Sequence, residues 1–196
     1  MKTNLQVESK EVISDKYDSA KIISNLSSVL DGNTLEECVG PIFYRDVKEC
    51  LDILDIGYKV SAVGILGRAI ELCTKLYFET LIKNKLAFQL NTGNKSIKQI
   101  REIFCGNNSK QDERLKLLNR QQVGKDSFKY RLNRQLLNKR FYNLLDSIRD
   151  ARNKAFHGCS NDEYDLLCEE SHLLIEWGLR ILIELKKEID QKSNQG

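Results

Sequence analysis

The sequence predicts an all-α fold, a helical bundle of four to five long helices. Long stretches of the 196-residue chain repeat apolar residues at intervals of three and four, the spacing that makes one face of an α-helix apolar. No stretch of any length alternates apolar and polar residues as a half-buried strand does. Pro41 is the single proline, so little else interrupts a helix. These three observations favour a domain built by packing helix on helix.

The first forty residues combine a loose polar start with one helix, expected at about residues 15–30. Asp31, Gly32 and Asn33 end this helix, because these residue types favour turns. Five apolar residues are expected on its inner face: Ile22, Ile23, Leu26, Val29 and Leu30. We treat residues 1–40 as one unit and residues 41–196 as a bundle with an insertion at about 91–133.

Two helices follow, at about 44–56 and 58–84, with a break or bend at Gly57. The second contains Gly64 and Gly67, each of which lowers helix stability by up to about 1 kcal/mol relative to alanine. Close approach of another helix would offset that loss. The same helix carries Arg68 and Glu71, which are three residues apart and can pair on one face as a structural salt bridge.

The insertion at 91–133 reads as two short helices with loops, and its low apolar density predicts weak packing. It is also basic: residues 91–140 hold thirteen Lys/Arg and four Asp/Glu, whereas residues 161–196 hold four and nine. A basic segment suits a polyanion, here nucleic acid, although a solvated lysine-rich surface is the alternative. The candidate contacts to an RNA backbone are Arg131, Arg134, Lys139, Arg140 and Arg149.

The last two helices are expected at about 134–157 and 161–190, with Ser160 or Asn161 as the N-cap of the second. Apolar residues cover a wider arc of the second helix than one neighbour needs. That arc suggests burial on two sides, in the bundle and in a homodimer with Leu174 and Trp177 at the interface. A central helix of a monomeric bundle is the alternative.

The compartment expected for this sequence is the cytoplasm. The first nineteen residues do not resemble a signal peptide, and no apolar run reaches the roughly 18 residues of a membrane span. The six cysteines contain no CxxC pair and read as reduced thiols.

Residues 152–158, Arg-Asn-Lys-Ala-Phe-His-Gly, are the most informative stretch. Cleavage of RNA without a metal needs a group that transfers protons and a cation that binds phosphate. His157 suits the first role because histidine has an ordinary pKa of about 6.5, and Arg152 suits the second through its planar fork of donors. Asn153 can orient the histidine or donate to a phosphate oxygen.

The helical spacing limits how these residues can meet. Asn153 and His157 share a face, but Arg152 lies about 140° from His157 around an ideal helix. Arg152 and His157 could converge if the last turn unwinds, or if two chains join their motifs. Arg152 also points toward the apolar side and needs an acceptor, such as Glu71, Asp150 or a bound phosphate. In the structural alternative, Arg152 forms a buried ion pair with an acidic residue, and His157 caps the end of the helix.

Residues 147–158, SIRDARNKAFHG, resemble the signature of HEPN domains (higher eukaryotes and prokaryotes nucleotide-binding). Residues 61–72, SAVGILGRAIEL, resemble the long first-half helix of HEPN-like bacterial proteins, and the resemblance covers roughly residues 43–190. It implies a HEPN-like bundle and a metal-independent endoribonuclease that acts as a homodimer and leaves 2′,3′-cyclic phosphates. Arg152 and His157 would be catalytic and Asn153 would assist. Such domains occur as toxins paired with an antitoxin and in anti-phage defence.

Two alternatives to catalysis remain: a non-catalytic HEPN-like module that binds nucleic acid, a nucleotide or a partner protein, and a purely structural oligomerisation bundle. A zinc site is a further possibility, since Cys168 and His172 lie four apart, but His157 and Cys159 would have to fold back onto their helix. We expect no metal and no cofactor.

Overall fold

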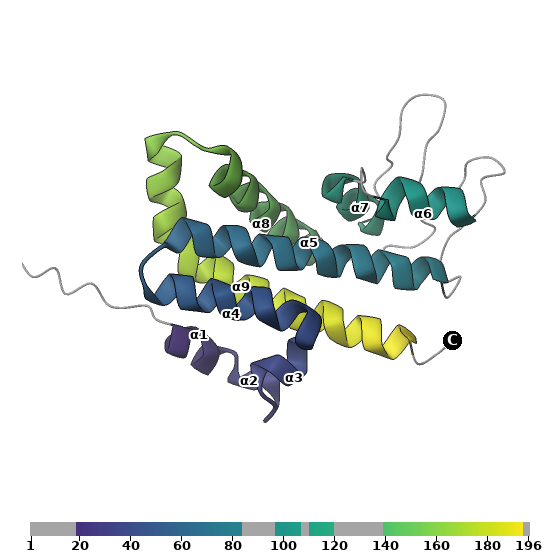
Figure 1. Ribbon diagram of the computed structural model, residues 1–196, viewed down its shortest axis with the longest axis horizontal. Coiled ribbons are helices and arrows are strands. Elements are labelled where there is room, and N and C mark those ends of the chain that lie inside the picture. The colour runs from purple at the N-terminus through teal and green to yellow at the C-terminus, as the bar shows by residue number, and fades with distance from the viewer. Residues whose placement is uncertain (1–18, 84–96, 107–109, 120–138, 194–196) are drawn as a thin grey trace, which may run out of the picture.

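The computed structural model describes residues 19–83, 97–106, 110–119 and 139–193, and no strand occurs in these ranges (Figure 1). The predicted all-α class is confirmed for them. In chain order the helices are α1 (Ser19–Asn25), α2 (Ser27–Leu30), α3 (Leu35–Val39), α4 (Pro41–Asp55), α5 (Lys59–Lys83), α6 (Ile97–Cys105), α7 (Gln111–Leu118), α8 (Lys139–His157) and α9 (Asn161–Ser193).

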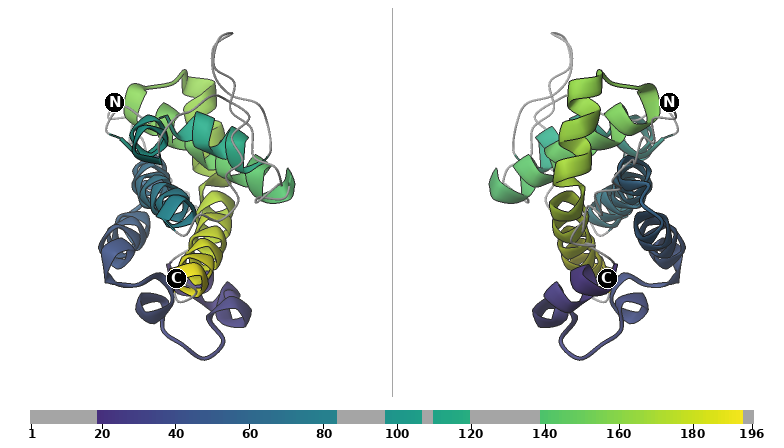
Figure 2. Two further views of the ribbon diagram at one scale, coloured as in Figure 1. Left: turned by 90° about the vertical axis from the view of Figure 1, so that its right-hand side faces the viewer. Right: turned by 90° about the vertical axis from the view of Figure 1, so that its left-hand side faces the viewer.

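Helix α5 lies at the centre of the bundle, in contact with α4, α8 and α9 and also with α6 and α7. Sixteen of its 25 residues are buried, so its apolar surface extends most of the way round, as a helix covered on several sides requires. The views along the long axis place α1–α3 and α6–α7 on opposite sides of this core (Figure 2). The α4–α5 and α8–α9 turns lie at the same end of the bundle (Figure 1).

Glycines allow the long helices to approach closely, as the sequence predicts for Gly64 and Gly67. A Cβ atom built on Gly64 would lie 3.2 Å from the Cβ of Ala155 in α8. One built on Gly67 would lie 2.5 Å from the Cβ of Arg152, closer than real Cβ atoms come. Gly178 of α9 packs against α5 in the same way. The two glycines of α5 therefore set the position of the C-terminal half of α8.

The N-terminal helix differs from the single segment expected at 15–30, since it divides into α1 and α2 at Leu26. It ends as predicted, at Asp31 and Gly32, whose positive φ angles of 51° and 80° turn the chain out of the helix. Ile22, Leu26 and Leu30 are buried, but Ile23 is 37% exposed. These buried residues belong to the same apolar cluster as the cores of α4, α5 and α9.

The expected weak packing of the insertion is wrong for its described residues. Phe104, Leu115, Leu117 and Leu118 are at most 1% exposed and form part of the main core. The ring centroids of Phe104 and Phe78 of α5 are 5.4 Å apart. The few apolar residues of α6 and α7 are concentrated on the faces that meet α5, so average composition gave a poor guide to packing.

Helix α9 begins with Ser160 as its cap, since the Ser160 Oγ accepts a hydrogen bond from the backbone N–H of Glu163 at 3.4 Å. The wide apolar arc is covered largely within the chain, because α9 contacts α1, α3, α5 and α8. Two guanidinium groups contact the ring of Trp177, with the guanidinium carbons of Arg140 and Arg180 at 5.1 Å and 5.7 Å from its centroid. Of the helices described, none has the length and apolar character needed to cross a membrane.

Candidate functional site

The candidate site is the C-terminal half of α8, where the chain approaches the start of α5. Helix α8 stays helical through His157 and ends at Gly158, which has a φ of 86° and donates its backbone N–H to the Lys154 carbonyl at 3.1 Å. Lys154 also pairs with Glu163 of α9 at 3.2 Å, and this contact helps fix the α8–α9 turn. The turn therefore places His157 at a defined and exposed position.

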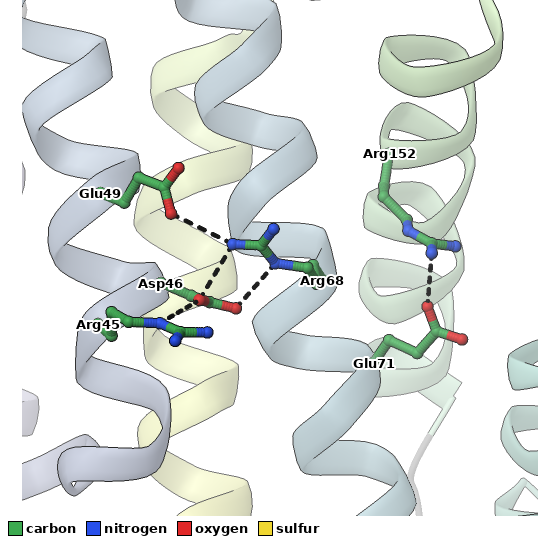
Figure 3. A network of polar contacts seen from close by, with 6 residues as sticks. All are labelled: Arg45, Asp46, Glu49, Arg68, Glu71 and Arg152. Carbon is green, nitrogen blue, oxygen red and sulfur yellow. Dashed lines mark hydrogen bonds and ion pairs between the residues drawn. The ribbon is translucent and has the colours of Figure 1, made fainter. Parts of the chain in front are cut away.

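Arg152 is held by contacts on several sides. Its Nη2 lies 2.9 Å from Glu71 Oε2, and its Nη1 donates to Asn153 Oδ1 at 3.3 Å. The guanidinium carbon lies 6.0 Å from the centroid of the Phe156 ring. Its side chain is 28% exposed, and its buried Nε has no hydrogen-bond partner among the described residues. The acceptor that the sequence requires for Arg152 is therefore Glu71 (Figure 3).

Glu71 also pairs with a second arginine, Arg114. Its carboxylate therefore connects α5, α7 and α8. Arg114 Nη2 of α7 lies 3.6 Å from Glu71 Oε1, and Arg114 Nη1 donates to the Phe104 carbonyl at 3.0 Å. The Arg114 side chain is 1% exposed, and burial lowers the pKa of its guanidinium, although the Glu71 charge opposes this. One carboxylate thus compensates one buried and one half-buried cation.

The expected pairing of Arg68 with Glu71 is wrong. Arg68 binds Asp46 of α4 through two hydrogen bonds of 3.0 Å and reaches Glu49 at 3.2 Å. Figure 3 shows Arg68 and Glu71 leaving α5 in different directions, one toward α4 and the other toward α8. A spacing of three permits a pair on an exposed face, but here each side chain has a better partner on a neighbouring helix. The contact with Asp46 raises the pKa of Arg68.

Arg152 and His157 do not converge within one chain. Because α8 remains helical to His157, the two side chains leave it about 140° apart. Arg152 faces α5, whereas His157 is exposed at the helix end beside the half-exposed Phe156. The structure brings Arg152 together with Asn153 and leaves His157 apart, so the unwound last turn considered from the sequence does not occur.

The candidate RNA contacts are only partly described. Arg131 and Arg134 lie outside the described residues. Lys139 is exposed at the start of α8, and Arg140 stacks on Trp177. Arg149 pairs with Asp146 at 2.8 Å, which neutralises much of its charge. These positions form no single basic stripe in the part of the chain that can be seen.

Burial makes three of the six cysteine thiols poor nucleophiles. All six are free thiols, and burial raises the pKa of Cys50 and Cys73 to about 12 and that of Cys105 to about 11. Across residues 19–83, 97–106, 110–119 and 139–193, no three His, Cys, Asp or Glu side chains form a group that could hold a metal ion. The zinc site weighed from the spacing of Cys168 and His172 therefore has no support in the geometry.

Two buried charged side chains of these surroundings, Arg114 and Asp46, were not predicted from the sequence. Comparison of the chain with protein-family models, curated proteins and solved structures found no match. The motif in α8 and its surroundings are therefore the features that bear on function. Glu71 links the motif to these surroundings, because its carboxylate pairs with both Arg152 and Arg114.

Proposed function

We propose that this protein is a metal-independent endoribonuclease of the HEPN type, acting as a homodimer. The observation that carries the proposal is the end of α8, where an anchored Arg152 is followed five residues later by an exposed His157. The proposed biological setting is that of a toxin or an anti-phage defence effector, with an antitoxin or another defence protein as partner. RNA is the proposed substrate.

In the proposed reaction the 2′-hydroxyl of a nucleotide attacks the adjacent phosphorus. A histidine takes the hydroxyl proton, the bond to the 5′-oxygen breaks, and a proton is delivered to that oxygen. The products are a 2′,3′-cyclic phosphate and a free 5′-hydroxyl. His157 suits the proton transfers because imidazole exchanges protons near neutral pH. Arg152 would stabilise the negative charge on the phosphorane, with Asn153 holding its guanidinium.

Two chains are required in this proposal, because Arg152 and His157 lie on different sides of one α8. A two-fold axis near the end of α8 would bring Arg152 of one chain beside His157 of its partner. Exposed apolar residues lie at the end of the bundle where α8 finishes, including Ile56 and Tyr58 at the α4–α5 turn and Phe156 of α8, and they would suit such a contact.

The direct test is RNA cleavage in the presence of a chelator. Purified protein is expected to cut structured RNA in excess EDTA, because no step in the proposed reaction uses a metal ion. The product ends are expected to resist phosphatase until acid opens the cyclic phosphate, as electrophoresis of labelled fragments can show. Cleavage that EDTA abolishes, or products that carry 5′-phosphates, would contradict the proposal.

The second candidate is a non-catalytic HEPN-like module that binds nucleic acid, a nucleotide or a partner protein. The observation that favours it is the ion pair between Arg152 and Glu71 at 2.9 Å, which already neutralises the proposed phosphate-binding cation. This candidate predicts nucleic-acid binding without cleavage in any buffer, with or without EDTA.

A further inference from the structure

A surface pocket of about 390 Å³ lies beside Glu71 and is lined by residues of α4, α5 and α7 and by Gly106, which follows α6. Its polar lining comes from four basic and two acidic side chains: Arg45, Arg68, Lys75, Arg114, Asp46 and Glu71. The lining therefore holds a surplus of two positive charges. The proposed catalytic residues Asn153 and His157 take no part in it.

Both carboxylates of the pocket are already engaged. Asp46 is 5% exposed and accepts two hydrogen bonds from Arg68. Arg45 Nε also lies 3.5 Å from Asp46 Oδ1. Glu71 is shared between Arg114 and Arg152. Both carboxylates are therefore already paired with arginines and neutralise little of the charge of Arg45 and Lys75.

Two cations of the pocket, Arg45 and Lys75, make few ionic contacts with the described residues. Lys75 forms no hydrogen bond or ion pair with any described residue. The Arg45 side chain is 85% exposed, and its single ionic contact is the 3.5 Å approach to Asp46. Arg114 is 1% exposed and already has partners, since its Nη1 donates to the Phe104 carbonyl at 3.0 Å and its Nη2 lies 3.6 Å from Glu71 Oε1. Its charge adds to the positive potential of the pocket.

We propose that this pocket is a binding site for a phosphate group, held by Arg45, Lys75 and the pocket side of Arg114. Arginine forks and a lysine ammonium are the side chains that proteins use to hold phosphate oxygens. The pocket has the volume of a small-molecule site, and it opens to solvent where Arg45 is exposed. The phosphate could belong to a nucleotide or to an RNA strand, since the contacting chemistry is the same. This inference does not depend on the proposed cleavage reaction.

The test measures phosphate binding by titration calorimetry at constant ionic strength, with four probes. These are inorganic phosphate, pyrophosphate, ATP and a single-stranded oligoribonucleotide without terminal phosphates. The variant Arg45→Gln/Lys75→Gln removes one exposed and one partly buried cation, both with few ionic contacts. We expect its affinity for the binding probes to fall about tenfold, because two cation–phosphate contacts are lost.

The matched control is Lys59→Gln/Lys98→Gln, which removes the same charge from exposed positions outside the pocket. Binding that drops in the pocket variant and not in the control supports the site. If the pocket variant loses affinity for pyrophosphate or ATP, the ligand is a free phosphorylated molecule. If it loses affinity for the oligoribonucleotide, the ligand is an RNA strand. No binding of any probe at millimolar concentration, or an equal loss in both variants, overturns the inference. Binding without RNA cleavage would retain the pocket and remove only the proposed function.

Discussion

His157→Ala is expected to slow RNA cleavage by about 10² to 10⁴-fold, the usual contribution of a general acid–base group. The proposal assigns the proton transfers to this imidazole, and alanine can accept or donate no proton. The side chain is exposed at the end of α8 and fills no part of the core, so the fold should be unaffected. The rate constant for cutting a labelled RNA at saturating protein measures the effect.

The matched control for this variant is His172→Ala, because His172 is the only other histidine of the chain. It lies in α9, outside the α8 motif, and its loss should leave the rate nearly unchanged. Circular dichroism and the melting temperature of both variants establish that each is folded. Equal rates for wild type and His157→Ala would remove His157 from the reaction.

Glu71→Gln is expected to lower the free energy of unfolding by roughly 3 kcal/mol, the scale of breaking a buried charge pair from one side. The amide keeps the size of the side chain but removes the charge that compensates Arg114 and Arg152. Arg114 is 1% exposed, so water cannot take over the role of the lost carboxylate. Denaturant titration of the folded protein measures the loss.

Glu79→Gln is the matched control, since Glu79 has the same 27% exposure as Glu71 but pairs at 3.7 Å with an exposed arginine, Arg101. It should cost less than about 1 kcal/mol, as exposed ion pairs contribute little. The double variant Glu71→Gln/Arg114→Met removes the buried cation as well and should regain part of the stability. Equal losses in the two single variants would show that Glu71 is no more than a surface acid.

The long helices could be predicted because their apolar stripes run for many turns. Helix α5 begins and ends within one residue of its expected limits, and Gly64 and Gly67 do face a neighbouring helix. The signals were weaker in short elements. Helix α7 has eight residues, and its apolar face is visible only once α5 lies against it.

The charged network could not be read from the sequence, although its members left a trace. Asp46 shares a face of α4 with Phe43 and Cys50, and Arg114 shares a face of α7 with Leu117 and Leu118. A charge within an apolar stripe predicts a buried partner. The identity of that partner depends on how α4 and α7 pack on α5. The spacing of residues along the chain does not predict this packing.

In the proposed dimer, Arg152 of one chain and His157 of the other complete one site. The most direct measurement mixes two inactive variants, Arg152→Ala and His157→Ala, after the dimers have been allowed to exchange chains. In a mixed dimer one of the two sites regains both wild-type residues, so the mixture is expected to recover about a quarter of wild-type RNA cleavage. No recovery, with chain exchange verified by differently tagged copies, would contradict a site shared between two chains.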